Sequence, residues 1–177
     1  MASDVYVDAF DELRDRLQTS IDSGSLSGFV RNVYVGPQPE QKFSPENMPS
    51  IILMDGGFAE NNYSAGAWET NADITIVVRI IIAIMQNQKE SNNTLYYKSG
   101  TMLPIALPAD LQGSGMMYLR SMILDAMFTK TDGTANGQFY RGVRSIKVSG
   151  SPPLFESDKF YQDITVVVST GNFEING

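Results

Sequence analysis

The sequence predicts an α+β fold: an antiparallel or mixed β-sheet with two amphipathic helices packed on one face and a long central strand. Three observations predict this class. Residues 3–21 and 114–129 carry apolar side chains at helical spacing. Residues 73–85 form an isoleucine-rich run whose β-branched side chains favour a strand. Shorter runs of the same kind precede and follow it. The length of 177 residues fits a single domain spanning 1–177.

The two predicted helices each have one apolar face. In the first helix this face consists of Tyr6, Phe10, Leu13, Leu17 and Ile21. Its other face is polar, and we expect Arg16 to lie there with the acidic residues. In the second helix the apolar face consists of Met116, Leu119, Ile123, Ala126 and Met127. Met117 and Met122 fall off that face and are candidates for a contact with another chain.

The remaining elements are short strands and two extended loops. We expect strands at 29–35, 50–54, 142–148 and 161–169. The second of these should end in a turn at Asp55-Gly56-Gly57. Four prolines predict that 36–49 is an exposed loop, because proline lacks a backbone donor. The connection 86–115 is long for a compact domain, and a loop of this length is usually functional.

Composition excludes several classes of chemistry. The chain has neither histidine nor cysteine, so histidine bases, thiolate catalysis and cysteine zinc sites are absent. Its net charge is −7, with lysine and arginine scattered singly, which argues against tight nucleic-acid binding. No signal peptide or membrane-spanning run is recognisable. Residues 132–137 begin with an aspartate but lack the second acid and the bidentate glutamate of a calcium loop. We therefore expect no metal, no cofactor and no membrane partner.

Carboxylates are the one catalytic option that the composition leaves open. Asp55, Glu60, Glu69 and Asp73 bracket one predicted turn region. Carboxylates alone can act in small hydrolases, with or without a divalent metal. The neighbouring glycines and asparagines instead indicate ordinary turn chemistry, and we favour the interpretation that the protein is not an enzyme.

The long strand predicts a subunit interface. Its even-numbered side chains, from Ile74 to Ile84, should pack against the helices as core. The odd-numbered face carries Val77, Ile81, Ala83 and Met85, with Arg79 in the middle. Two helices cannot cover both faces, so we expect these five residues to contact a neighbouring subunit, with Arg79 paired to a carboxylate across the interface. The alternative is that 86–115 folds back over this face.

The two halves of the chain also resemble each other. Asp73-Ile74-Thr75-Ile76-Val77-Val78 is similar to Asp163-Ile164-Thr165-Val166-Val167-Val168. A Ser-Ile pair precedes each segment, at Ser50-Ile51 and at Ser145-Ile146. These likenesses indicate either an internal duplication or a chance match between β-branched strands.

Taken together, these elements resemble the tail terminator (tail completion) proteins of long-tailed bacteriophages. The stretches that carry the resemblance are 8–21, Asn32-Val33-Tyr34-Val35-Gly36, 49–54, 74–85, 118–127 and 143–168. The closing pair, Arg144-Ser145-Ile146-Lys147-Val148 and Tyr161-Gln162-Asp163-Ile164-Thr165-Val166, is the most similar part. The 86–115 segment is longer than the family pattern.

The resemblance implies a structural virion protein at the head-proximal end of the tail, present in the host cytoplasm during assembly. Such a protein forms a homo-hexameric ring that caps the tube of major tail protein and stops its polymerisation. It then presents a joining surface to the head–tail connector, and DNA passes through the ring without specific binding. An acidic chain suits such a conduit because like charges repel. The alternatives are another head–tail connector or tube-like virion component, or the small carboxylate-dependent hydrolase.

Overall fold

The computed structural model describes residues 4–38, 47–61, 69–83, 116–128, 143–152, 154–156, 159–170 and 173–174. Its helices are α1 (Asp4–Ser23) and α3 (Met116–Phe128). Its strands are β1 (Asn32–Val35), β2 (Ser50–Asn61), β3 (Glu69–Ala83), β4 (Val143–Gly150), β5 (Leu154–Glu156), β6 (Lys159–Thr170) and β7 (Phe173–Glu174). The predicted loop 86–115, the segment 132–137 and residues Ile84 and Met85 lie outside the described residues.

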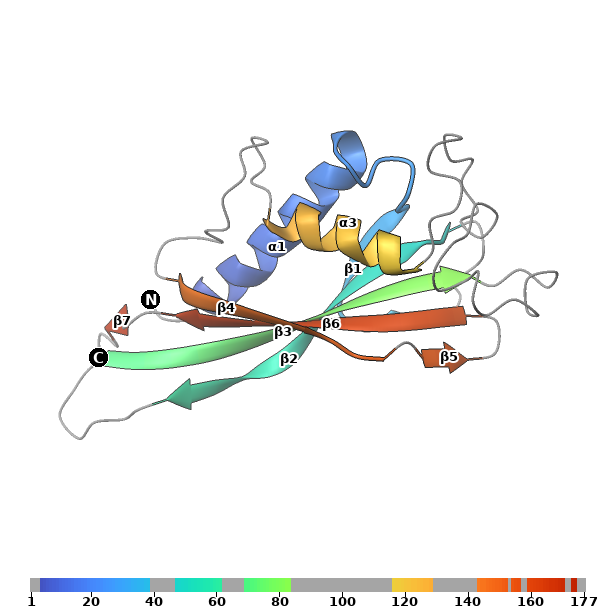
Figure 1. Ribbon diagram of the computed structural model, residues 1–177. Helices are drawn as coiled ribbons and strands as arrows, with labels where there is room; N and C mark the ends of the chain where they lie inside the picture. Colours follow the sequence, from blue (N-terminus) through green and yellow to red (C-terminus); the bar gives the residue numbers. More distant parts are fainter. Residues whose placement is uncertain are drawn as a thin grey trace.

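The strands form one mixed sheet, and the helices lie together on one of its faces (Figure 1). The strand order is β1-β2-β3-β6-β4, with β5 pairing β6 and β7 pairing β3. β1 runs parallel to β2, and the other pairings are antiparallel. The predicted α+β class is therefore confirmed, and β3, with 15 residues, lies in the middle of the order.

The main core lies between the helices and the sheet. Alternate side chains of β3 (Ile74, Ile76, Val78, Ile80 and Ile82) are at most 4% exposed and belong to it. The helices contribute Ala9, Leu13, Leu17, Leu119, Ile123, Ala126 and Met127. This alternation follows from the two-residue period of a strand, so the even-numbered face of β3 is core as predicted. Phe10, Ile21 and Met122 pack against the same core but stay partly exposed.

Arg16 does not lie on the solvent face of α1, contrary to the sequence prediction. The residue is 3% exposed, and its guanidinium contacts Glu12 on its own helix and the carbonyl of Met127 on α3. The periodicity of α1 identifies an apolar stripe, but it does not show that α3 covers the flank of that stripe. Packing of the two helices buries a residue that a lone helix would leave in water.

β2 continues through the glycine pair at which the sequence predicts a turn. The register against β3 shifts between Asp55 and Phe58, which marks a β-bulge, and pairing then resumes to Asn61. Gly57 has a φ of 91°, a conformation that glycine adopts without strain. The Asp55 carboxylate accepts a hydrogen bond from the Gly57 backbone N–H at 2.7 Å. A bulge and a turn use the same residue types, so composition alone does not separate them.

Gly56 is the tightest point of this bulge, and we expect Gly56→Ala to destabilise the fold by about 1–3 kcal/mol. An added Cβ would lie 2.6 Å from Thr75 Cγ2 and 3.1 Å from the Thr75 carbonyl oxygen. Urea denaturation followed by circular dichroism measures the loss. Gly150→Ala in β4 is the control, because its Cβ would meet only the Asp163 carbonyl oxygen at 3.9 Å. Equal losses for both variants would contradict this account.

The similar Asp-Ile-Thr segments of β3 and β6 lie side by side and antiparallel. Ile76 is paired with Val166, its own counterpart in the sequence match. Each half therefore contributes a helix followed by an antiparallel strand pair, with β3 and β6 adjacent (Figure 1). The two Ser-Ile pairs, by contrast, do not pair with equivalent positions of β3 and β6. Ile51 lies opposite Ile80, whereas Ile146 lies opposite Val168, the counterpart of Val78.

Candidate functional site

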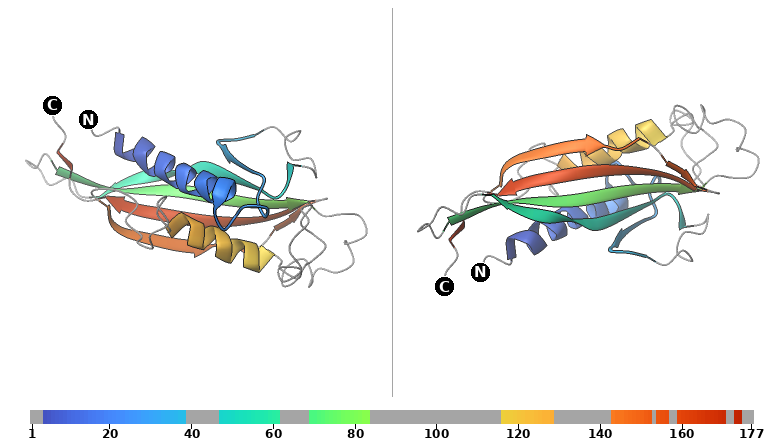
Figure 2. Two further views of the ribbon diagram at one scale, coloured as in Figure 1. Left: turned by 90° about the horizontal axis from the view of Figure 1, so that it is seen from above. Right: turned by 90° about the horizontal axis from the view of Figure 1, so that it is seen from below.

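The sheet face opposite the helices is the first candidate site. Among the described residues, no helix packs against it, as the view from below shows (Figure 2). Side chains of β2, β3 and β6 that alternate with the core residues point to this face. Of the predicted interface residues, Val77, Arg79 and Ile81 lie here with described side chains. Ala83 ends β3 with an undescribed side chain, and Met85 falls outside the described residues.

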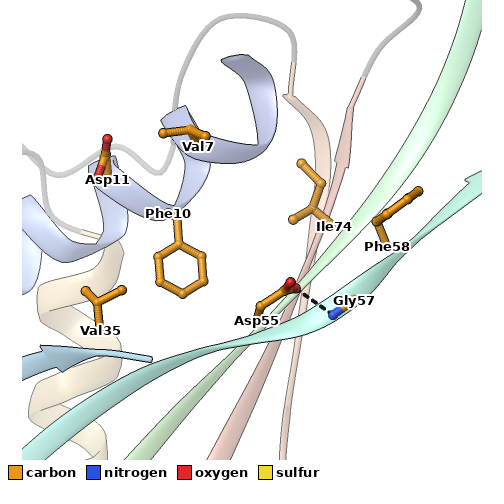
Figure 3. Close-up of a pocket in the computed structure, with 8 residues that line it drawn as sticks. All are labelled: Val7, Phe10, Asp11, Val35, Asp55, Gly57, Phe58 and Ile74. Carbon is orange, nitrogen blue, oxygen red and sulfur yellow. Dashed lines mark hydrogen bonds between the residues drawn. The ribbon is translucent and has the colours of Figure 1, made fainter. Parts of the chain in front are cut away.

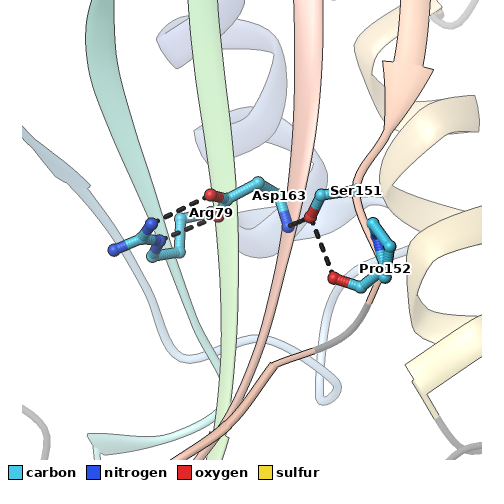
Figure 4. Close-up of polar contacts among 4 residues, drawn as sticks. All are labelled: Arg79, Ser151, Pro152 and Asp163. Atoms are coloured by element: carbon cyan, nitrogen blue, oxygen red, sulfur yellow. Dashed lines mark hydrogen bonds and ion pairs between the residues drawn. The ribbon is translucent and has the colours of Figure 1, made fainter.

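Arg79 is paired within its own chain, so the predicted ion pair across an interface is wrong. Its Nε and Nη2 atoms donate to the two carboxylate oxygens of Asp163 at 2.8 and 2.9 Å (Figure 4). The two residues are directly opposite each other on β3 and β6. The guanidinium also lies 5.7 Å from the ring centre of Tyr161, a cation–π distance. A bidentate pair of this kind fixes the register of the two strands.

The partner of Arg79 is itself held in place by the chain that follows β4. The backbone N–H of Asp163 donates to the Ser151 hydroxyl at 3.2 Å, and that hydroxyl donates to the Pro152 carbonyl at 3.1 Å (Figure 4). The Ser151 backbone N–H donates to the Asp163 carbonyl at 2.8 Å. The Arg79–Asp163 pair is therefore part of a network joining β3, β6 and the end of β4.

Ile81 is buried inside the chain, and the prediction that it faces a neighbouring subunit is wrong. It is 1% exposed and forms a second, smaller core with Met48 and Ile52. Tyr34, Met54 and Tyr161 pack around these three residues. The end of the proline-rich segment covers this part of the sheet, so Met48 and Pro49 are buried, whereas the sequence predicts an exposed loop over 36–49. Residues 39–46 of that loop lie outside the described residues.

A partly exposed strip remains on this face beyond the small core. Val77 lies between Met54 on β2 and Thr165 on β6, and all three side chains are half-buried. Thr75 and Val167 continue the strip in the next row. A cavity of about 220 Å³ opens beside it, lined by Ile52, Met54, Arg79, Ile81, Lys159 and Tyr161 together with Pro37 and Gln38. The strip offers apolar surface for a protein contact and holds no cluster of catalytic groups.

The two candidate catalytic carboxylates whose side chains are described, Asp55 and Asp73, do not come together. Asp55 lies opposite Ile76 and faces the helices, whereas Asp73, opposite Ala59, belongs to the other sheet face. Each has a structural role: Asp55 accepts from Gly57, and Asp73 accepts from the Ser169 hydroxyl at 2.5 Å. The side chains of Glu60 and Glu69 are not described. Among the described residues, no group of three or more metal-binding acids occurs.

The sequence does not predict the second candidate site, a groove between α1 and the bulge of β2 (Figure 3). This α1–β2 groove has a volume of about 470 Å³. It is lined by Val7, Phe10, Asp11, Val35, Asp55, Gly57, Phe58 and Ile74. Val7, Val35 and Phe58 are 58%, 46% and 63% exposed, which is high for apolar side chains. A phenylalanine directly after a glycine pair was the available signal, but interpreting the pair as a turn ends the predicted strand before Phe58.

The two acids of the groove differ in their surroundings. Asp11 forms an ion pair with Arg14 at 3.0 Å. Arg14 also donates to Asp15, and this hydrogen bond raises the pKa of Arg14 above its ordinary value. Asp55 is exposed, and no lysine or arginine in the described part of the chain forms an ion pair with it. The groove is thus apolar at its centre, with a carboxylate at its edge that lacks a countercharge among these residues.

Comparison of the sequence with models of known protein families and with curated proteins gives no match. Over the described ranges, neither helix combines the length and the hydropathy that crossing a membrane requires.

Proposed function

We propose that the chain is a structural virion protein that forms a ring at the head-proximal end of a bacteriophage tail. In this role it caps the tail tube, terminates tail polymerisation and provides the joining surface to the head connector. The proposal rests on the resemblance of the sequence to tail terminators and on one structural observation. In the described part of the chain, helices cover only one face of the sheet, while the other face keeps an apolar strip (Figure 2).

The interface in this proposal is smaller than the sequence suggests. Ile81 and Arg79 are engaged inside the chain, so Val77 becomes its central residue, with Met54 and Val167 beside it. Ala83 and Met85 stay predicted members. Half-buried valine and methionine side chains on this sheet face suit contact with another folded subunit, where an apolar centre is surrounded by polar groups.

The first experiment is the mass of the native particle, measured by light scattering over a range of concentrations and followed by negative-stain imaging. We expect closed rings. Open tubes would favour the alternative, a tube-like virion component. The purified full-length chain should also block elongation when it is added to growing tubes of the major tail protein. Divalent-metal-dependent hydrolysis abolished by Asp55→Ala or Asp73→Ala would contradict the structural role.

Val77→Glu is expected to weaken assembly by about 10- to 100-fold in Kd while leaving the subunit folded. A carboxylate at this half-buried position stays hydrated in the monomer but loses water in an interface. Sedimentation velocity measures the assembly, and circular dichroism checks the fold. Ser121→Glu, on the exposed side of α3, is the control. Unchanged assembly of Val77→Glu would remove the sheet face from the interface.

A further inference from the structure

The most exposed large apolar side chains in the described residues gather at opposite edges of the sheet. Val7, Val35 and Phe58 surround the α1–β2 groove at the β1–β2 edge. Val148 on β4 and Leu154 on β5, 40% and 60% exposed, lie at the other edge. Each edge on its own exposes apolar surface to water, which is unfavourable for an isolated subunit. Two such patches at opposite ends of one molecule allow copies to join in a row.

The two patches also carry opposite charges. The groove contains Asp55, which has no basic partner among the described residues. Beside Val148 on β4 is Lys147, which is exposed and forms no ion pair within the same ranges. Opposite charges at the margins of two apolar patches direct their association and set its orientation. A groove that met its own copy would instead bring like charges together.

The two patches also differ in their place in the fold. The groove is a concave site with a volume of about 470 Å³, open to solvent between α1 and β2 (Figure 3). β4 is the last strand of the main sheet order, and its outer edge has no strand beside it in the described residues. Successive residues of a strand point to opposite faces. Lys147, opposite Val167, and Val148, opposite Val166, therefore project from opposite faces of β4 at this open edge.

We propose that the α1–β2 groove of one copy receives the β4 edge of a second copy, with Val148 against Phe58 and the long side chain of Lys147 reaching around the strand edge toward Asp55. This inference rests on the proposed ring function and identifies the contact that joins neighbouring subunits. The two surfaces differ, so the contact is head-to-tail, and head-to-tail contacts produce closed rings when the rotation between copies closes. The apolar strip of the sheet face adjoins β4 through β6, so it would lie against the same neighbour.

Charge reversal tests this contact with the full-length chain. Asp55→Lys and Lys147→Asp are each expected to raise the Kd of assembly about tenfold or more at low salt, because each places like charges together. The double variant should recover to within about threefold of the original chain. Mass photometry at several concentrations measures all three. Asp22→Lys, on the exposed end of α1, is the control for an equal change in net charge.

Two further variants keep the test valid if Asp55→Lys disturbs the bulge. Asp55→Asn retains an oxygen that can accept from Gly57 and removes only the charge, so we expect a smaller weakening, of about threefold. Phe58→Ser removes the largest exposed apolar side chain of the groove and should weaken assembly at least tenfold. Thermal unfolding checks that each variant is folded.

The outcomes separate this contact from the proposed function. Rings that form normally in Phe58→Ser and in both charge variants would overturn the inference and leave the ring function intact. Head-to-tail dimers or filaments that never close, but respond to the charge swap, would support the contact and overturn the ring. An original chain that stays monomeric at every concentration would overturn both.

Discussion

Ile81→Glu should unfold the protein rather than separate its subunits. Ile81 is 1% exposed and lies against Met48 and Ile52. Truncating such an isoleucine to alanine costs about 2–5 kcal/mol, and burying a carboxylate there adds a desolvation penalty of several kcal/mol more. The total is comparable with the whole stability of a typical domain, about 5–15 kcal/mol. We expect loss of the native circular dichroism spectrum and poor solubility.

Val77→Glu, by contrast, is expected to leave the subunit folded. Both residues lie on the same face of β3, one row of side chains on either side of Arg79, but only Ile81 is covered by the segment that contains Met48. Ile81→Ala is the milder variant, with an expected loss of about 2–4 kcal/mol in urea denaturation. A folded, stable Ile81→Glu would mean that the Met48 segment does not hold its place in solution. The whole odd-numbered face of β3 would then be available as one continuous interface.

Much of the fold follows from periodicity because periodicity is local. The even-numbered residues of β3 from Ile74 to Ile82 are all β-branched and apolar, whereas the odd-numbered face contains Thr75 and Arg79, and this pattern places Ile76, Val78 and Ile80 in the core. The helix stripes through Leu17 and Ile123 are predicted in the same way. These features depend only on neighbours within a few positions of the same segment.

The parts that sequence reasoning missed depend on contacts between distant segments. Alternation shows which face Ile81 occupies, but not that Met48 returns to cover it. The Arg79–Asp163 pair requires β3 and β6 to be neighbours, which follows from strand order and not from either strand alone. The α1–β2 groove exists because β2 passes through its glycine pair as a bulge.

These corrections reduce the predicted interface on β3 to the strip around Val77 and direct attention to the edges of the sheet as well. Arg79 is paired inside the chain and Ile81 is covered, so both stabilise the subunit itself and offer little surface to a partner. The most exposed apolar side chains lie beside the bulge of β2 and on β4 and β5. A subunit that is stable alone and apolar at both edges can stay monomeric at low concentration and join others as concentration or a template favours it.

Arg16→Ala should destabilise the protein by about 3 kcal/mol, the lower end of the range for breaking a buried ion pair. The guanidinium of Arg16 donates to Glu12 Oε1 at 3.1 and 2.5 Å, and to the Met127 carbonyl at 3.3 Å. It is the only described arginine whose side chain is almost fully buried, and it joins α1 to the C-terminal turn of α3. The Glu12 side chain is 30% exposed, so water can partly hydrate it after the change, which keeps the loss moderate.

Two variants separate the charge of Arg16 from its packing. Arg16→Met keeps an apolar stem between the helices and should cost about 2 kcal/mol, less than Arg16→Ala, because the packing remains while the charge-assisted hydrogen bonds to Glu12 are lost. Arg14→Ala is the control on the same helix. Arg14 pairs with Asp11 and Asp15 at the surface, where such pairs contribute about 0–1 kcal/mol. Urea denaturation measures all three, and equal losses for Arg14→Ala and Arg16→Ala would show that Arg16 does not join the helices in solution.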